Sequence, residues 1–131
     1  MKARTAADIM TRPVITVGPG ALLIDAIELL LRHGLSGMPV VDAAGRLIGI
    51  ITEHDIMNFA LSGNAADTRV EEAMTKPVAT VAPDADMAVA INFLIGRRLR
   101  RVPVVEGDRV VGIISRRDIL REMLSMYREY H

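Results

Sequence analysis

The sequence predicts an α+β fold made of two similar repeats, and three observations support this prediction. Residues 10–41 align with residues 74–105 without a gap, and 15 of these 32 positions are identical. Each repeat alternates short β-branched runs with longer apolar segments. The β-branched runs come in pairs joined by polar loops, a pattern typical of hairpins. Two copies favour a pseudo-symmetric pair over a solenoid, because a solenoid needs more repeats to bury its core.

The same elements are expected in the same order in each repeat: a short helix, an extended piece, a helix, a hairpin and a last helix. Pro13 and Pro77 end the short helices, because proline is not tolerated in a helix interior. In the first repeat these elements cover 5–9, 14–17, 22–32, 38–41 with 47–51, and a helix after Thr52. In the second repeat they cover 70–74, 78–81, 87–97, 102–105 with 110–114, and a helix after Ser115.

A polar stretch at residues 62–67 separates the repeats, so the expected division is 1–64 and 65–131. The long helices over 22–32 and 87–97 are nearly all apolar. Helices of this composition are buried on more than one side. Each is therefore expected to face its own sheet and also a second surface, either the other repeat or a second chain.

A strand-to-helix motif occurs in both repeats, with the pattern Gly-Ile-Ile-Thr/Ser-x-x-Asp over residues 49–55 and 112–118. The hydroxyl residue, Thr52 or Ser115, suits the N-cap of the following helix, and Asp55 or Asp118 falls at the third helical position. One interpretation is a capping box and nothing more. The other is that a hydroxyl, free backbone N–H groups and a carboxylate share a cleft suited to a phosphate and a sugar diol.

Composition argues against several functional classes. Aromatic residues make up only 3% of the chain and the formal net charge is zero, so nucleic-acid binding is not expected. There is no cysteine, and the three histidines have no acidic partners at ligand spacing, so no metal site is expected. No apolar run has the length of a membrane span or of a signal core, which predicts a cytoplasmic protein without membrane contact. Ser115 has no base at motif spacing, so catalysis is not expected.

The ordered set of motifs resembles the cystathionine β-synthase (CBS) domain family. It comprises Met-Thr-Arg/Lys-Pro-Val at 10–14 and 74–78, Pro-Val-Val at 39–41 and 103–105, and the two strand-to-helix motifs. The resemblance implies two repeats packed through their sheets, called a Bateman module, with two clefts for an adenosine-containing ligand. That ligand would be AMP, ADP, ATP or S-adenosylmethionine, acting as a regulatory ligand with no cofactor required.

The resemblance also implies a role for each candidate residue. Asp55 and Asp118 would accept hydrogen bonds from a ribose diol, and Thr52 and Ser115 would contact phosphate. The purine slot would be lined by Val14, Ile15 and Thr16 with Gly37, Met38 and Pro39, and in the second repeat by Val78, Ala79 and Thr80 with Arg101, Val102 and Pro103. The alternative for Val14, Val78 and Val102 is ordinary core packing.

Arginines distinguish the second repeat from the first. Residues 97–101 read Arg-Arg-Leu-Arg-Arg, where the first repeat has His-Gly-Leu-Ser-Gly, and Arg116 and Arg117 replace Glu53 and His54. The second cleft is therefore expected to favour phosphates, with Arg100, Arg101 and Arg117 as contacts. The alternative is that these arginines form a solvated helix end, where cations are favourable.

Two functional hypotheses follow. In the first, the chain is a regulatory module that senses a nucleotide, forms a homodimer and signals to an unidentified protein. In the second, it is a structural module without ligand, whose apolar helices serve oligomerisation and partner docking. Residues 125–131 are expected to extend the last helix and to add to dimer contacts.

Overall fold

The computed structural model describes residues 4–61, 65–97 and 99–130. It divides into two compact units: Ile15–Val78, called unit 2, and Met1–Val14 with Ala79–His131, called unit 1. The sequence repeats and the compact units therefore divide the chain differently. The segment that opens the first repeat belongs to unit 1, together with most of the second repeat. Each unit is described by itself below.

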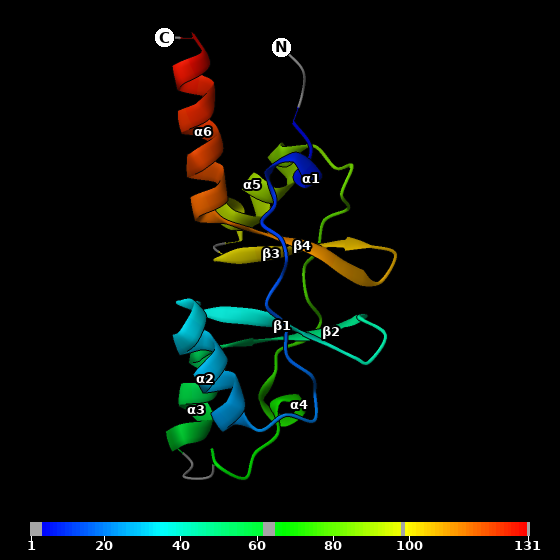
Figure 1. The fold of residues 1–131 in the computed structure, drawn as a ribbon, viewed down its shortest axis with the longest axis vertical. Helices are drawn as coiled ribbons and strands as arrows, with labels where there is room; N and C mark the ends of the chain where they lie inside the picture. The colour runs from blue at the N-terminus through cyan, green and yellow to red at the C-terminus, as the bar shows by residue number, and fades with distance from the viewer. Residues whose placement is uncertain (1–3, 62–64, 98, 131) are drawn as a thin grey trace. The chain divides into compact units, whose positions relative to one another are not determined.

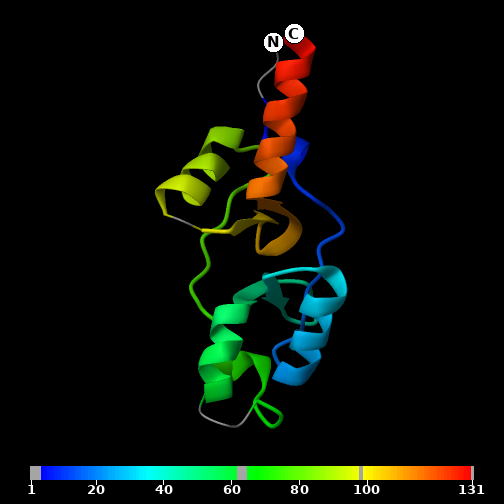
Figure 2. The ribbon, with the colours of Figure 1, turned by 90° about the vertical axis from the view of Figure 1, so that its left-hand side faces the viewer.

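Unit 2 is a β-hairpin covered by helices. Its elements are α2 (Leu23–His33), β1 (Gly37–Val41), β2 (Leu47–Thr52), α3 (Glu53–Leu61) and α4 (Val70–Ala73). The strands β1 and β2 pair antiparallel, and Figures 1 and 2 show α2 and α3 against the same face of this hairpin. The core lies between these layers and is aliphatic, with Leu23, Met38, Val40 and Ile51 fully buried.

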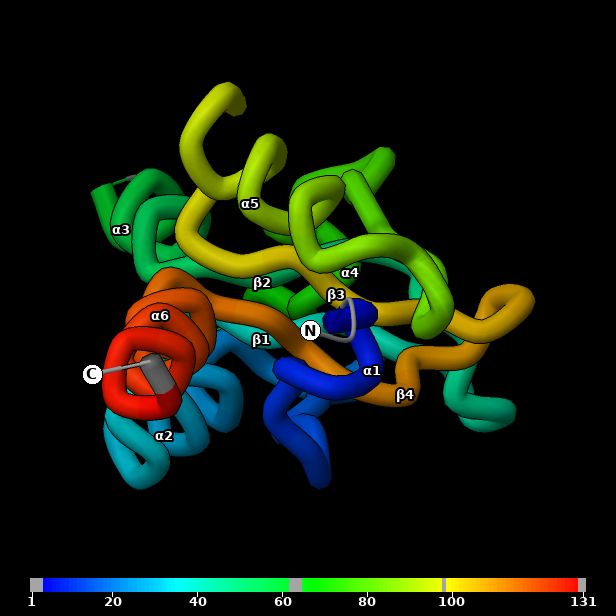
Figure 3. Tube along the Cα trace, turned by 90° about the horizontal axis from the view of Figure 1, so that it is seen from above, coloured from blue at the N-terminus to red at the C-terminus, as the bar shows by residue number. Residues whose placement is uncertain are grey.

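Unit 1 repeats this architecture. Its elements are α1 (Ala6–Ile9), α5 (Met87–Gly96), β3 (Arg101–Glu106), β4 (Arg109–Ser115) and α6 (Arg116–Tyr130). β3 and β4 form the second antiparallel hairpin. Its core contains Ala90, Leu94, Val102, Val104 and Ile114, and it also takes Ala6 and Ile9 from α1. In Figure 3 the N-terminal segment, in dark blue, runs along β4 with α1 beside it.

Local sequence explains where the elements begin and end. Thr5 and Asp8 form a reciprocal capping box that starts α1. The side chain of Asp86 accepts the Ala88 N–H at 2.9 Å and starts α5. Gly34 ends α2 in the left-handed conformation, with φ of 63°. The α+β class and both hairpins are confirmed. α6 extends to Tyr130 as expected for residues 125–131, of which residue 131 lies outside the described part of the chain.

One local expectation differs from the structure. The extended pieces 14–17 and 78–81 form no strand of their own, and each makes only a single parallel bridge, from Val17 to Val40 and from Val81 to Val104. Prolines on both sides of each piece interrupt a longer ladder. Leu31 of α2 is 78% exposed and Ile95 of α5 is 72% exposed, so a second chain as the further surface of these helices stays a prediction.

Candidate functional site

In unit 2 the turn from β2 into α3 is a complete capping box. The Thr52 N–H and the Thr52 hydroxyl both donate to Asp55 Oδ2 at 2.9 Å, and the Asp55 N–H donates back to Thr52 Oγ1 at 3.2 Å. The cap expected from the sequence is therefore present. Asp55 is partly exposed, so its carboxylate remains in contact with solvent.

In unit 1 the equivalent aspartate is buried. The Ser115 N–H donates to Asp118 Oδ2 at 2.8 Å and the Ser115 hydroxyl donates to the same oxygen at 3.2 Å. Arg121 Nη1, one helical turn further along α6, donates to Asp118 Oδ1 at 2.9 Å. Asp118 is only 3% exposed, so the two repeats present the same residue type in two different environments.

A threonine from the other sequence repeat contacts each aspartate. The Thr11 hydroxyl donates to Asp118 Oδ1 at 2.6 Å, and the Thr75 hydroxyl donates to Asp55 Oδ1 at 2.9 Å. Both threonines also form an antiparallel bridge to the strand that ends at the turn, Thr11 with Ile113 and Thr75 with Ile50. The Met-Thr motif of each repeat is thus a structural partner of the other repeat's strand-to-helix turn.

The glycine of each strand-to-helix motif makes room for this contact. A Cβ added to Gly112 would lie 2.7 Å from Met10 Cγ, and one added to Gly49 would lie 2.6 Å from Met74 Sδ. Distances this short force the neighbouring group to move. Glycine at 49 and 112 therefore allows the methionine before each threonine to pack directly on the strand.

The structure brings most of the first-repeat candidate residues together at one end of the hairpin. Gly37 is the register partner of Thr52. Val17 forms a parallel bridge with Val40 of β1, so Ile15 and Thr16, which precede Val17, lie beside the start of β1. Val14 is the exception, since it belongs to unit 1. Met38 is fully buried in the core and Pro39 is fully buried as well, so neither presents an accessible surface to a ligand.

The second-repeat candidates follow the same arrangement. Arg101 is the register partner of Ser115, and Ala79 and Thr80 precede the bridge from Val81 to Val104. Val78 belongs to unit 2. Val102 and Pro103 are fully buried, and Val102 is a member of the unit 1 core. Core packing, the alternative considered for Val102, is what the structure shows for that side chain.

The arginines do not all gather at the second turn. Arg100 and Arg117 are exposed and Arg101 is partly buried. Arg116 turns toward the preceding helix and donates to the Leu94 carbonyl at 3.3 Å. The arginine that does reach Asp118 is Arg121, which sequence reasoning missed, although its position three residues after Asp118 on a helix is a usable signal.

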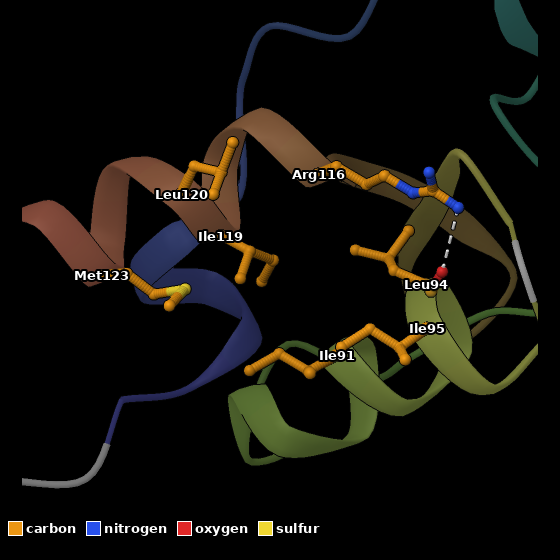
Figure 4. A pocket seen from close by; sticks show the side chains of 7 residues that line it. All are labelled: Ile91, Leu94, Ile95, Arg116, Ile119, Leu120 and Met123. Carbon is orange, nitrogen blue, oxygen red and sulfur yellow. Dashed lines mark hydrogen bonds between the residues drawn. The ribbon is translucent and has the colours of Figure 1, made fainter.

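Neither Asp55 nor Asp118 lines the two cavities described next. One, of about 590 Å³, lies in unit 2 and is lined by Leu47, Ile48, Lys76, Pro77 and Val78; only Val78 was a candidate. The other, of about 450 Å³, is an apolar groove between α5 and α6. Figure 4 shows Ile91, Leu94 and Ile95 of α5 on one side of it and Ile119, Leu120 and Met123 of α6 on the other.

Within residues 4–61, 65–97 and 99–130, no three side chains of metal-binding type are grouped so as to hold an ion. No helix over the same residues has the length and apolar character needed to cross a membrane.

Two similar α+β hairpin units with matching strand-to-helix turns define a tandem-repeat protein. The CBS domain family matches this chain twice, over residues 6–62 and 70–125, and the chain belongs to that family. Among its relatives, the A-adding tRNA nucleotidyltransferase of Geobacter sulfurreducens is 38% identical over 92% of the chain. The chain spans only 13% of that enzyme's length, so the similarity concerns one part of the larger protein.

Solved structures show the same architecture. The CBS domain pair of protein MJ0100, in complex with 5′-methylthioadenosine and S-adenosyl-L-methionine, is 32% identical with a TM-score of 0.83, over 95% of this chain and 99% of that one. CBSX2 in complex with AMP is 27% identical with a TM-score of 0.83, over 94% of this chain and 98% of that one; CBSX2 comes from Arabidopsis thaliana. The chain is therefore a CBS domain pair, a type of regulatory ligand-sensing module.

Proposed function

We propose that this CBS pair senses an adenosine-containing ligand, of the AMP, ADP, ATP or S-adenosylmethionine class, at its strand-to-helix turns. The ligand chemistry is supported by the complexes of its structural relatives, which contain AMP in one case and 5′-methylthioadenosine with S-adenosyl-L-methionine in the other. Within this chain, the observation that carries the proposal is the partly exposed carboxylate of Asp55, held at the start of α3 beside the first-repeat candidate residues.

The chemistry of this turn suits a nucleoside. An ionised carboxylate accepts up to about four hydrogen bonds. The described residues donate three to the Asp55 carboxylate: the Thr52 backbone N–H, the Thr52 hydroxyl and the Thr75 hydroxyl. A ribose hydroxyl can take the remaining position, and the positive end of α3 favours a phosphate. A ligand that joins β1 to the start of α3 would stabilise one arrangement of these elements and so pass on a signal.

Ligand binding is expected to raise the melting temperature in a thermal-shift assay with AMP, ADP, ATP and S-adenosylmethionine. A ligand at one hundred times its Kd stabilises the native state by about 2.7 kcal/mol. Asp55→Asn should weaken nucleotide binding about tenfold, equal to about 1.4 kcal/mol, and leave inorganic phosphate unaffected. Asn58→Ala, an exposed change on the same helix, serves as the control. No shift with any of the four compounds at millimolar concentration would contradict the proposal.

A second role, as an oligomerisation module, is favoured by the groove between α5 and α6. Its edges carry large apolar side chains in solvent: Ile95 is 72% exposed, Leu120 is 63% exposed and Met123 is 58% exposed. Tyr127, further along α6, is also exposed. Exposed apolar patches of this kind mark interaction surfaces. We propose a homodimer through this surface, which is compatible with ligand sensing.

Leu120→Glu is expected to convert that dimer into a monomer, because a carboxylate would be buried without a partner in the interface. Sedimentation velocity at micromolar concentration measures the change. Ala60→Glu adds the same charge at an exposed position of α3, outside the groove and outside residues 125–131, and should leave the dimer intact. A wild-type protein that sediments as a monomer at all concentrations would exclude this role. The cytoplasmic location and the absence of a required cofactor stay predictions.

A further inference from the structure

The two strand-to-helix turns are not equally available to a ligand. They are built from the same motif, yet the aspartate of one is buried and the aspartate of the other is partly exposed. The two carboxylates differ in the hydrogen-bond donors that contact them. The donors to each carboxylate from the described residues are compared below.

Every acceptor position of Asp118 is occupied. Oδ2 accepts from the Ser115 N–H and from the Ser115 hydroxyl. Oδ1 accepts from the Thr11 hydroxyl at 2.6 Å and from Arg121 Nη1 at 2.9 Å. Since a carboxylate offers about four lone-pair positions, these contacts leave none for the hydroxyl groups of a sugar.

Asp55 differs at one of these positions. Its partners are Thr52 and Thr75, which match Ser115 and Thr11, but the residue that corresponds to Arg121 is Asn58. Asn58 is exposed and makes no hydrogen bond to Asp55 among the described contacts. One acceptor position on Asp55 Oδ1 is consequently open.

We infer that Thr11 and Arg121 close the second-repeat turn, so that only the first-repeat turn takes a ligand while these contacts persist. This inference rests on the proposed function. It departs from the expectation that the arginine-rich second cleft favours a phosphate, because the arginine that reaches this turn, Arg121, pairs with Asp118. Thr11 lies in the segment that precedes both hairpins, so closure also depends on how that segment docks on β4.

The test is the number of ligand molecules bound per chain, measured by isothermal titration calorimetry with AMP and with S-adenosylmethionine. The wild-type protein should bind one. The double variant Thr11→Val with Arg121→Ala removes both donors to Asp118 Oδ1, keeps the shape of residue 11 and should bind two. Asn58→Ala changes the position of unit 2 that matches Arg121, removes no donor to Asp55 and should leave the number at one.

Circular dichroism and urea unfolding establish that each variant is folded before titration. Two molecules bound to the wild-type chain, or one bound to a folded double variant, would overturn this inference and leave the proposed function standing. No binding to the wild-type chain or to the double variant would overturn both. A second readout is the carboxyl ¹³C resonance of Asp118, which should respond to ligand in the double variant and not in the wild-type protein.

Discussion

Asp118→Ala is expected to lower the free energy of unfolding by about 3 kcal/mol, from the loss of a helix cap and of a buried hydrogen-bond acceptor. The carboxylate is 3% exposed, so water does not readily replace it. Its removal leaves the Ser115 N–H without its partner and releases the Thr11 hydroxyl. Arg121 contributes little to this loss, because its side chain is 68% exposed.

The matched change in unit 2 is Asp55→Ala. It is expected to lower the free energy of unfolding by only about 1 kcal/mol, as the loss of an ordinary helix cap does. Asp55 is partly exposed, so water can satisfy the donors that lose it. Urea unfolding of the two variants and of the wild-type protein, followed by circular dichroism, gives the comparison. Equal losses for the two variants would show that burial does not distinguish the two turns.

Gly112→Ala is expected to lower the free energy of unfolding by about 2 kcal/mol, because the new methyl group overpacks the contact between β4 and the N-terminal segment. Its Cβ would lie 2.7 Å from Met10 Cγ and 3.0 Å from Met10 Cβ. The methionine must move, and the segment that carries Thr11 moves with it. The variant should therefore also speed hydrogen exchange of the Thr11 N–H, which donates to the Ile113 carbonyl at 2.8 Å, and NMR measures this rate.

A double-mutant cycle separates this mechanism from a general effect on the strand. Adding Met10→Ala to Gly112→Ala removes the overlapping Cγ and Sδ atoms and should restore part of the stability, with a coupling energy above about 0.5 kcal/mol. Additive losses would mean that Met10 is not the group displaced. Gly49→Ala makes the corresponding change against Met74 in unit 2 and should leave hydrogen exchange of the Thr11 N–H unchanged.

Local sequence patterns predicted the elements well, because their determinants lie close together in the chain. Capping of α3 needs only Thr52 and Asp55, three residues apart, and the two hairpins follow from paired β-branched runs. The apolar composition of α2 and α5 predicted a second apolar surface on each helix, and Leu31 and Ile95 are exposed there; composition does not show which partner covers that surface.

Candidate site residues could be predicted only in part. Gly37 and Arg101 do lie beside Thr52 and Ser115, as the motif order suggested. Met38 and Val102 instead fill the two cores, because alternate residues of a strand point to opposite faces and the sequence does not state which face is covered. The assignment of all these positions as ligand contacts stays a prediction.

By itself, the sequence determined the repeated α+β units and the capped turns, because hydrophobic periodicity and capping act over a few residues. Only the tertiary structure decided which motif meets which turn. Thr11 contacts a carboxylate 107 residues away and Thr75 contacts one 20 residues away, yet the two motifs are nearly identical in sequence. Either threonine has the chemistry to donate to either aspartate, so the pairing depends on how the chain folds into its two units.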